Sequence, residues 1–231
     1  MRSILAVGVF LVSVTAIVGD ESAARKALKP FNHFIGTWRA TGTPEGTREE
    51  KQRGFWTESL SWAWAFKSDD AWLTVAFDKG KYFRKGELRY LADKSVYQLT
   101  LSTPDREGLV FTGKLADDRL TLTREDADAK ETQQLVMTLL HANRFLYRYE
   151  VRPQGKTSFT KRYQVGATKE GEAFAASDGQ PECIVSGGLG TIKVTYKGQT
   201  YYVCCTGCRD EFNARPEKYI KEYEVRKKGL K

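Results

Sequence analysis

Cysteine is missing from the first 182 residues of this 231-residue chain, and all four cysteines lie in its last quarter. Histidine is scarce as well, because His33 and His141 are the only two. Imidazole ligands are therefore few, and each histidine is expected to be structural or solvated. Any metal or thiol chemistry must come from the C-terminal cysteines.

The sequence also lacks the short motifs of common catalytic sites. It contains no G-x-S-x-G, no H-E-x-x-H, no phosphate-binding glycine loop and no dinucleotide fingerprint. The acidic pairs Glu49-Glu50 and Asp69-Asp70 have the character of solvated turn charges. A Cys–His catalytic pair would form only if the cysteine segment folded against His33 or His141. We therefore predict that the protein is not an enzyme.

Long runs of like charge are missing from most of the chain, because acidic and basic residues alternate there. The net charge is +8, from 37 Lys and Arg against 29 Asp and Glu. Only residues 225–231 form a basic tail. Since no nucleic-acid-binding motif accompanies this charge, we expect a solvated basic surface and no nucleic-acid partner.

The one long apolar run lies at the N-terminus, where Arg2 precedes the mainly apolar residues 4–18. This is the anatomy of an export signal, which we assign to residues 1–19. The run is short for a bilayer span, which needs about 20 residues, and an uncleaved N-terminal anchor is the alternative. We expect an exported protein, periplasmic or secreted, with no stable membrane span after cleavage.

From residue 34 onward the hydrophobic pattern has a period of two. Large apolar residues take alternate positions in one segment: Trp56, Leu60, Trp62, Trp64 and Phe66. This alternation is typical of a strand with one buried face. Turn signals separate further predicted strands at residues 71–77, 81–83, 87–91, 96–102, 109–115, 120–124, 133–140, 145–152 and 158–166. A short helical segment is expected at residues 21–28, before Pro30.

Nine or ten consecutive strands with short connections favour an antiparallel up-and-down barrel over residues 31–170, because closure removes exposed strand edges. A sandwich is the alternative. All five tryptophans lie in the first third of this region. They either fill the core or line a cavity for a small apolar ligand.

One short motif at the start of this region is Phe34-Ile35-Gly36-Thr37-Trp38. It resembles the G-x-W of lipocalin-like (calycin) barrels. The resemblance implies that Trp38 closes one barrel end and packs against an arginine of a late strand, for which Arg162 is the candidate. Physically, the glycine permits a tight entry into the barrel and the indole excludes water.

A linker at residues 171–181, rich in small residues, leads to a cysteine segment at residues 182–224. Residues 191–196 and 199–203 alternate around a Lys-Gly turn, which predicts a β-hairpin, and a helix kinked at Pro216 follows. The predicted fold class is therefore mainly β, a lipocalin-like antiparallel up-and-down β-barrel followed by a small ββα cysteine-rich module.

The cysteines occupy defined places in this module. Cys183 precedes the hairpin, Cys204 ends it and Cys208 begins the helix. Three sulfurs that are distant in sequence are thereby brought together. The helix N-terminus favours thiolate over thiol, as does a bound cation.

A wider set of residues accompanies the cysteines: Gly187, Tyr196, Gly198, Tyr201, Tyr202, Gly207, Phe212 and 216–220. With these residues the segment resembles a YHS domain of the TRASH-like group, small metal-binding modules tied to heavy-metal trafficking and sensing. The resemblance implies Cys183, Cys204 and Cys208 as metal ligands. It leaves Cys205 as a companion whose role is less defined.

The segment departs from that group at one position. Many members carry a second cysteine three residues after the first, where this chain has Ser186. A zinc site with four thiolates would then need Cys205 or an outside ligand. Adjacent strand residues point in different directions, so Cys204 and Cys205 are not expected to share one metal easily. Three thiolates suit trigonal Cu(I), and soft ligands favour Cu or Zn ions.

Disulfide bonding is the alternative, because the cysteine count is even and the predicted compartment is oxidising. The metal-bound and disulfide-bonded states of the cysteines lead to two alternative hypotheses for the function. In the first, an exported protein binds Cu or Zn through cysteine thiolates, and the barrel is a scaffold or a docking surface for a protein partner. In the second, a lipocalin-like barrel carries a small apolar ligand and the cysteine module is a disulfide-stabilised structural cap. A filled barrel interior favours the first function and an open cavity the second.

Overall fold

The computed structural model describes residues 22–141, 143–170 and 181–229. The predicted export signal at residues 1–19 therefore lies outside the described residues, as does nearly all of the predicted linker. No helix among the described residues is long and apolar enough to cross a membrane.

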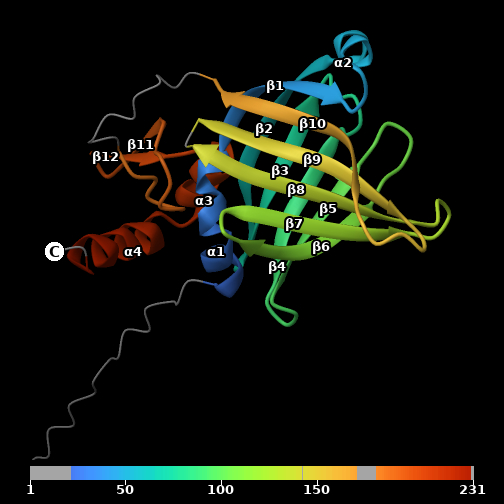
Figure 1. The fold of residues 1–231 in the computed structure, drawn as a ribbon. Coiled ribbons are helices and arrows are strands. Elements are labelled where there is room, and N and C mark those ends of the chain that lie inside the picture. The colour runs from blue at the N-terminus through green and yellow to red at the C-terminus, as the bar shows by residue number, and fades with distance from the viewer. Residues whose placement is uncertain (1–21, 142, 171–180, 230–231) are drawn as a thin grey trace, which may run out of the picture.

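Ten strands within these ranges form one closed antiparallel barrel (Figure 1). Each strand pairs with its neighbours in sequence, and β1 closes the barrel against β10. The strands are β1 (Gly36–Pro44), β2 (Trp56–Lys67), β3 (Asp70–Asp78), β4 (Lys85–Leu91), β5 (Val96–Ser102), β6 (Leu109–Ala116), β7 (Arg119–Asp126), β8 (Glu131–His141), β9 (Arg144–Pro153) and β10 (Thr160–Lys169). The predicted up-and-down barrel is confirmed, in place of the sandwich.

Two details of the barrel differ from the expectation. The strand predicted at residues 81–83 is wrong, because this segment forms the turn between β3 and β4. A helix that was not predicted, α2 (Arg48–Gly54), lies in the connection between β1 and β2. Its N-terminus is a capping box, in which the Thr47 side chain accepts the Glu50 N–H and the Glu50 carboxylate accepts the Thr47 N–H.

One end of the barrel is closed by the N-terminal helices, α1 (Ala23–Leu28) and the 3₁₀ helix η1 (Lys29–Phe34). Phe34 packs between the rings of Trp62 and Phe145, with centroids 5.6 and 4.9 Å away. The fully buried Trp38 donates its indole N–H to the Phe34 carbonyl at 2.7 Å. Trp38 therefore lies at the plugged end of the barrel.

The cation beside Trp38 is Lys169, and the prediction of Arg162 is wrong. The β1–β10 register places Lys169 directly opposite Trp38. Its ammonium lies 5.6 Å from the centre of the indole ring, a cation–π geometry. Arg162 lies seven residues earlier on the same strand and lines a cavity at the other end of the barrel.

The middle of the barrel is filled by side chains. Its interior leaves a cavity of only about 20 Å³ among apolar residues that include Leu60, Trp62 and Met137. Even-numbered residues of β2 point inward, as the alternation predicted. Glu58 is the one charged residue among these inward positions of β2. Its carboxylate is buried and accepts hydrogen bonds from the Tyr147 hydroxyl, the Trp56 indole N–H and the Lys81 backbone N–H.

The C-terminal module consists of a hairpin, β11 (Ile192–Tyr196) and β12 (Gln199–Val203), followed by α3 (Thr206–Ala214) and α4 (Pro216–Gly229). The predicted ββα module is therefore confirmed. Helix α4 continues into the basic segment at residues 225–231. There Arg226 bonds to the Glu182 carboxylate at 3.1 Å and to the Ile184 carbonyl at 2.9 Å, which ties the helix to the segment before β11.

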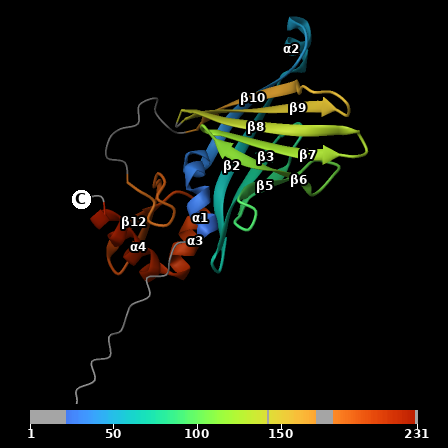
Figure 2. The same ribbon diagram turned by 60° about the horizontal axis from the view of Figure 1, so that its bottom comes forward.

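The module lies at the barrel end that α1 and η1 cover (Figures 1 and 2). Strand β2 extends past β1 there, because the first residue of β1, Gly36, already pairs with Trp62. Helix α3 covers this extension so closely that a Cβ on Gly207 would lie 1.7 Å from the Trp64 carbonyl oxygen. Only a glycine hydrogen fits in this contact.

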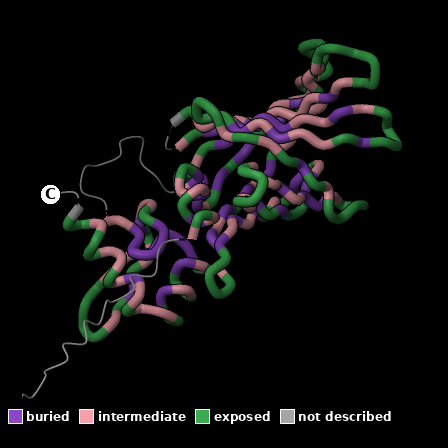
Figure 3. The backbone as a smooth tube through the Cα atoms, turned by 90° about the horizontal axis from the view of Figure 1, so that it is seen from below, coloured by how far each residue is buried: buried purple, intermediate pink, exposed green. Residues whose placement is uncertain are grey.

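Helix α1 and η1 form the rest of the contact. Arg25 pairs with Glu222 of α4 at 2.9 Å and donates to the Val185 carbonyl. Asn32 accepts the Trp64 indole N–H at 2.9 Å and donates to the Ser186 carbonyl at 3.0 Å. Buried residues run continuously from the barrel into the module (Figure 3).

The Gly207→Ala substitution is expected to destabilise the protein by about 1–3 kcal/mol, because the added methyl would force α3 away from β2. Urea denaturation followed by tryptophan fluorescence measures the change. The matched control is Gly166→Ala in β10, where the new methyl would meet Leu146 at an ordinary 3.4 Å. Equal stability of the two variants would contradict the contact.

Candidate metal centre

Cys183 lies in a tight turn before β11. Its backbone N–H donates to the Gly188 carbonyl at 2.6 Å, and the Gly187 N–H donates to the Cys183 carbonyl at 2.9 Å. Gly187 has φ +78°, a left-handed conformation that favours glycine. The turn places the Ser186 N–H 3.4 Å from the Cys183 sulfur, where it acts as a hydrogen-bond donor.

The other three cysteines follow from the end of β12. Cys204 is the first residue after the strand, Cys205 is the N-cap of α3, and Cys208 lies in the first turn of that helix. The positive end of the helix dipole therefore faces the sulfurs and favours negative charge on them. Because β11 and β12 are antiparallel, the end of β12 lies beside the turn that contains Cys183.

The Sγ atoms of Cys183, Cys204 and Cys208 lie within 4.8 Å of one another. Cys183 and Cys208 are fully buried, and Cys204 is 9% exposed. The three thiolates of a zinc ion, with Zn–S bonds of about 2.3 Å, lie about 3.8 Å apart. The Sγ atoms of Cys204 and Cys208 are 3.5 Å apart, and all four cysteines are free. These residues therefore fit a thiolate-bound metal ion.

Ser186 lies beside this cluster, three residues after Cys183. Its side chain is buried, and its Oγ lies 3.4 Å from the Cys204 sulfur. The Gly188 N–H donates to the same oxygen at 3.3 Å. The Ser186 hydroxyl therefore shares a hydrogen bond with the Cys204 sulfur, and either group can be the donor.

Cys205 is adjacent to the three-sulfur cluster but outside it. Its Sγ lies 3.8 Å from that of Cys204 and accepts the backbone N–H of Trp64 at 3.4 Å. This N–H lies on the part of β2 that has no β1 partner, where a buried donor would otherwise be unsatisfied. Cys205 thus joins the barrel to the sulfur cluster.

The thiols differ in their acidity. Hydrogen bonds from Cys204 and Cys208 lower the pKa of Cys183, and the same two thiols lower the pKa of Cys205. The pKa of Cys204 is raised, first by its hydrogen bond to Cys183. Burial raises the pKa of Cys208, and hydrogen bonds to the other thiols add to this shift. Cys183 and Cys205 are therefore the more acidic thiols of the four, and Cys204 and Cys208 the less acidic.

Neither histidine belongs to this cluster among the residues that the structure describes. His33 is exposed on η1, and the side chain of His141 lies outside the description. Sequence reasoning missed the contributions of Asn32 and Trp64, because their contacts depend on how the module docks. The position of Ser186 three residues after Cys183 was visible, but its hydrogen bond to Cys204 was not.

Comparison with known protein families matches residues 190–223 to the YHS domain. The match includes Cys204, Cys205 and Cys208, whereas Cys183 lies seven residues before its first residue. The predicted C-terminal YHS domain is thereby confirmed. No curated protein matches the chain.

Metal affinity is expected to rise with pH. Cys204 and Cys208, whose pKa values are raised, hold protons at neutral pH that a metal must displace. Release of one or two protons increases the apparent affinity by about 10- to 100-fold per pH unit. Competition with a chelator between pH 6 and 8 measures this slope, and calorimetry in buffers of different ionisation enthalpy counts the protons. An affinity independent of pH would contradict it.

Proposed function

We propose that this protein binds a soft heavy-metal ion, copper or zinc, through Cys183 and through Cys204 and Cys208 of its YHS domain. The observation that carries the proposal is the convergence of three buried sulfurs from a turn, a strand end and a helix N-terminus. The YHS match supports it independently, because that family suggests heavy-metal binding. The barrel then serves as the scaffold that holds the module.

The donor set favours an ion that accepts three thiolates. A closed tetrahedral zinc site needs a fourth strong ligand, and Ser186 offers only a hydroxyl beside Cys204. Cys205 is near, but its sulfur already accepts the Trp64 N–H. We therefore propose an open site suited to trigonal Cu(I), from which the ion can exchange to a protein partner.

We propose binding rather than catalysis, because the four cysteines are 0–9% exposed and no catalytic motif accompanies them in the sequence. We also propose export to the periplasm or outside the cell, on the basis of the charged and apolar pattern of residues 1–19. N-terminal sequencing of the protein from its native host tests this assignment. An intact Met1 would contradict cleavage.

The alternative function is a carrier barrel with a disulfide-bonded cap. Two observations count against it. The four cysteines are free in the structure, and the middle of the barrel, around Leu60, Trp62 and Met137, leaves only about 20 Å³ for an apolar ligand. Mass measurement separates the alternatives, since a disulfide lowers the mass by two hydrogens and a bound metal raises it.

Removal of Cys208 is expected to abolish metal binding. Native mass spectrometry of Cys208→Ser, purified without reductant or chelator, should show the metal-free mass, whereas the wild type retains one ion. The matched control is Cys205→Ser, which removes a sulfur outside the cluster and should still bind the ion. Loss of metal from both variants alike would show that Cys205 is a ligand.

The Ser186→Cys substitution is expected to convert the open site to a closed one. A sulfur placed near Cys204 supplies the fourth thiolate, which zinc uses and trigonal Cu(I) does not need. Zinc affinity should rise by at least about tenfold, which corresponds to about 1.4 kcal/mol. Cu(I) affinity, measured by competition with a chromophoric chelator, should change little. An unchanged zinc affinity would argue that residue 186 does not reach the ion.

A further inference from the structure

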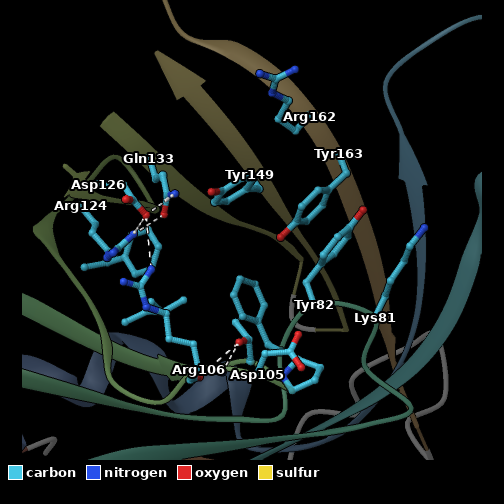
Figure 4. A pocket seen from close by; sticks show the side chains of 15 residues that line it. Lys81, Tyr82, Asp105, Arg106, Arg124, Asp126, Gln133, Tyr149, Arg162 and Tyr163 are labelled. Carbon is cyan, nitrogen blue, oxygen red and sulfur yellow. Dashed lines mark hydrogen bonds and ion pairs between the residues drawn. The ribbon is translucent and has the colours of Figure 1, made fainter. Parts of the chain in front are cut away.

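The barrel end away from the cysteine module contains a cavity of about 620 Å³. Side chains from β6 to β10, from the β3–β4 turn and from the β5–β6 loop line it (Figure 4). Its volume lies within the usual range of small-molecule sites, about 300–1,000 Å³. It shares Phe83 with the small cavity of the barrel interior, and none of the four cysteines lines it.

Three nearly parallel tyrosine rings form one wall of this cavity. Tyr163 lies between Tyr82, with centroids 4.3 Å apart and planes at 9°, and Tyr149, with centroids 5.2 Å apart and planes at 15°. Figure 4 shows the three side by side. Within the described part of the chain their hydroxyls make no hydrogen bond. Burial raises the pKa of Tyr163, and that of Tyr149 to about 12, so both remain donors at neutral pH.

This wall is held rigidly from behind. The indole of Trp56 packs edge-on against Tyr82 at 5.3 Å and against Tyr163 at 5.6 Å. Its N–H donates to the buried Glu58 carboxylate at 3.0 Å, and Tyr147 donates to the same carboxylate at 2.7 Å. The rings are therefore positioned before any ligand arrives, which reduces the entropy cost of binding.

The charges that line the cavity are predominantly positive. Four cations, Lys81, Arg106, Arg124 and Arg162, lie against two carboxylates, Asp105 and Asp126. Arg124 is neutralised by Asp126 at 2.8 Å, and Arg106 lies 3.7 Å from the same carboxylate. The exposed guanidinium of Arg162 makes no ion pair or hydrogen bond to any residue that the structure describes. The Lys81 ammonium lies 4.7 Å from the centre of the Trp56 ring and donates to the Gly54 carbonyl at 3.4 Å, but it pairs with no carboxylate of the described residues.

We propose that this cavity binds a planar aromatic molecule that carries an anionic group such as a carboxylate or a sulfonate. The ring system packs against the tyrosine wall, and the phenol hydroxyls donate to polar atoms of the ligand. Arg162 and Lys81 attract the anion. The ligand class differs from the small apolar molecule expected from sequence, and the proposal is independent of metal binding.

Two fluorescent probes test the proposal with the full chain. The first, 8-anilinonaphthalene-1-sulfonate, is an aromatic anion, and the second, N-phenyl-1-naphthylamine, has the same rings without the charge. The wild type should bind one equivalent of the anion at least about tenfold more tightly than the neutral probe, and added salt should narrow this difference. Tyr149→Ala should weaken both probes.

Matched variants test whether Lys81 and Arg162 cause the preference for the anionic probe. The double variant Lys81→Gln with Arg162→Gln should lose the preference for the anion while it keeps the affinity for the neutral probe. Arg119→Gln, an exposed arginine at the other end of β7, is the control and should bind as the wild type does. Cys208→Ser should also bind both probes normally, which separates this site from the metal site. Near-UV circular dichroism verifies that each variant is folded.

Three outcomes would overturn the proposal. The first is absence of binding by the folded wild type. The second is a neutral probe that binds as well as the anion, which would indicate a simple apolar site. The third is a double variant that loses no more affinity for the anion than Arg119→Gln does.

Discussion

The contact between the first turn of α3 and the overhanging end of β2 is the constraint on which the arrangement of the molecule depends. Strand β2 is longer than its neighbour β1, so the backbone at Trp64 has no partner strand on one side. The Trp64 N–H is accepted by the Cys205 sulfur, and the Trp64 carbonyl lies against Gly207. A strand edge that would otherwise be unsatisfied becomes the surface that positions a sulfur cluster.

This contact also sets the environment of the sulfurs. Cys183 and Cys208 belong to the same continuous apolar core as the barrel residues. A low local dielectric strengthens the attraction between thiolates and a cation, and it makes a thiolate without a cation costly. Burial accordingly raises the pKa of Cys208, because the buried thiolate is disfavoured relative to the thiol. The opposite mouth of the barrel is open and is lined by tyrosines and charged side chains, so the two ends of the barrel provide different environments.

Much of the fold and of the cysteine cluster can be predicted from patterns among residues that are close together in the sequence. Alternation along 56–66 predicts the inward face of β2, and the spacing of Cys183, Cys204 and Cys208 predicts their convergence. The capping box at Thr47 and Glu50 was equally local, and α2 could have been predicted from it. Sequence-based prediction of a side-chain contact failed where the two residues lie far apart in the sequence. Arg162 and Lys169 are both cations on β10, and only the register with β1 decides which one meets Trp38.

The inward carboxylate of Glu58 shows the same limit. Its position in the alternation was readable, but its tolerance inside the barrel depends on donors from Tyr147, Trp56 and Lys81. Tyr147 and Lys81 lie outside β2, so no pattern within this strand predicts their hydrogen bonds to Glu58. Ser186 is similar, because its hydroxyl contacts a cysteine eighteen residues later. Buried polar groups are therefore predicted from sequence less reliably than apolar ones.

Strand β2 carries Trp56 at the mouth of the barrel and Trp64 at the cysteine end, eight residues later. An insertion or deletion of one residue between them would reverse the inward parity of one end. Either the tyrosine wall would lose the indole behind it, or α3 would lose the backbone against which Gly207 packs. A change in the length of the loop that carries α2 would leave this parity intact, whereas a change of one residue between Trp56 and Trp64 would not.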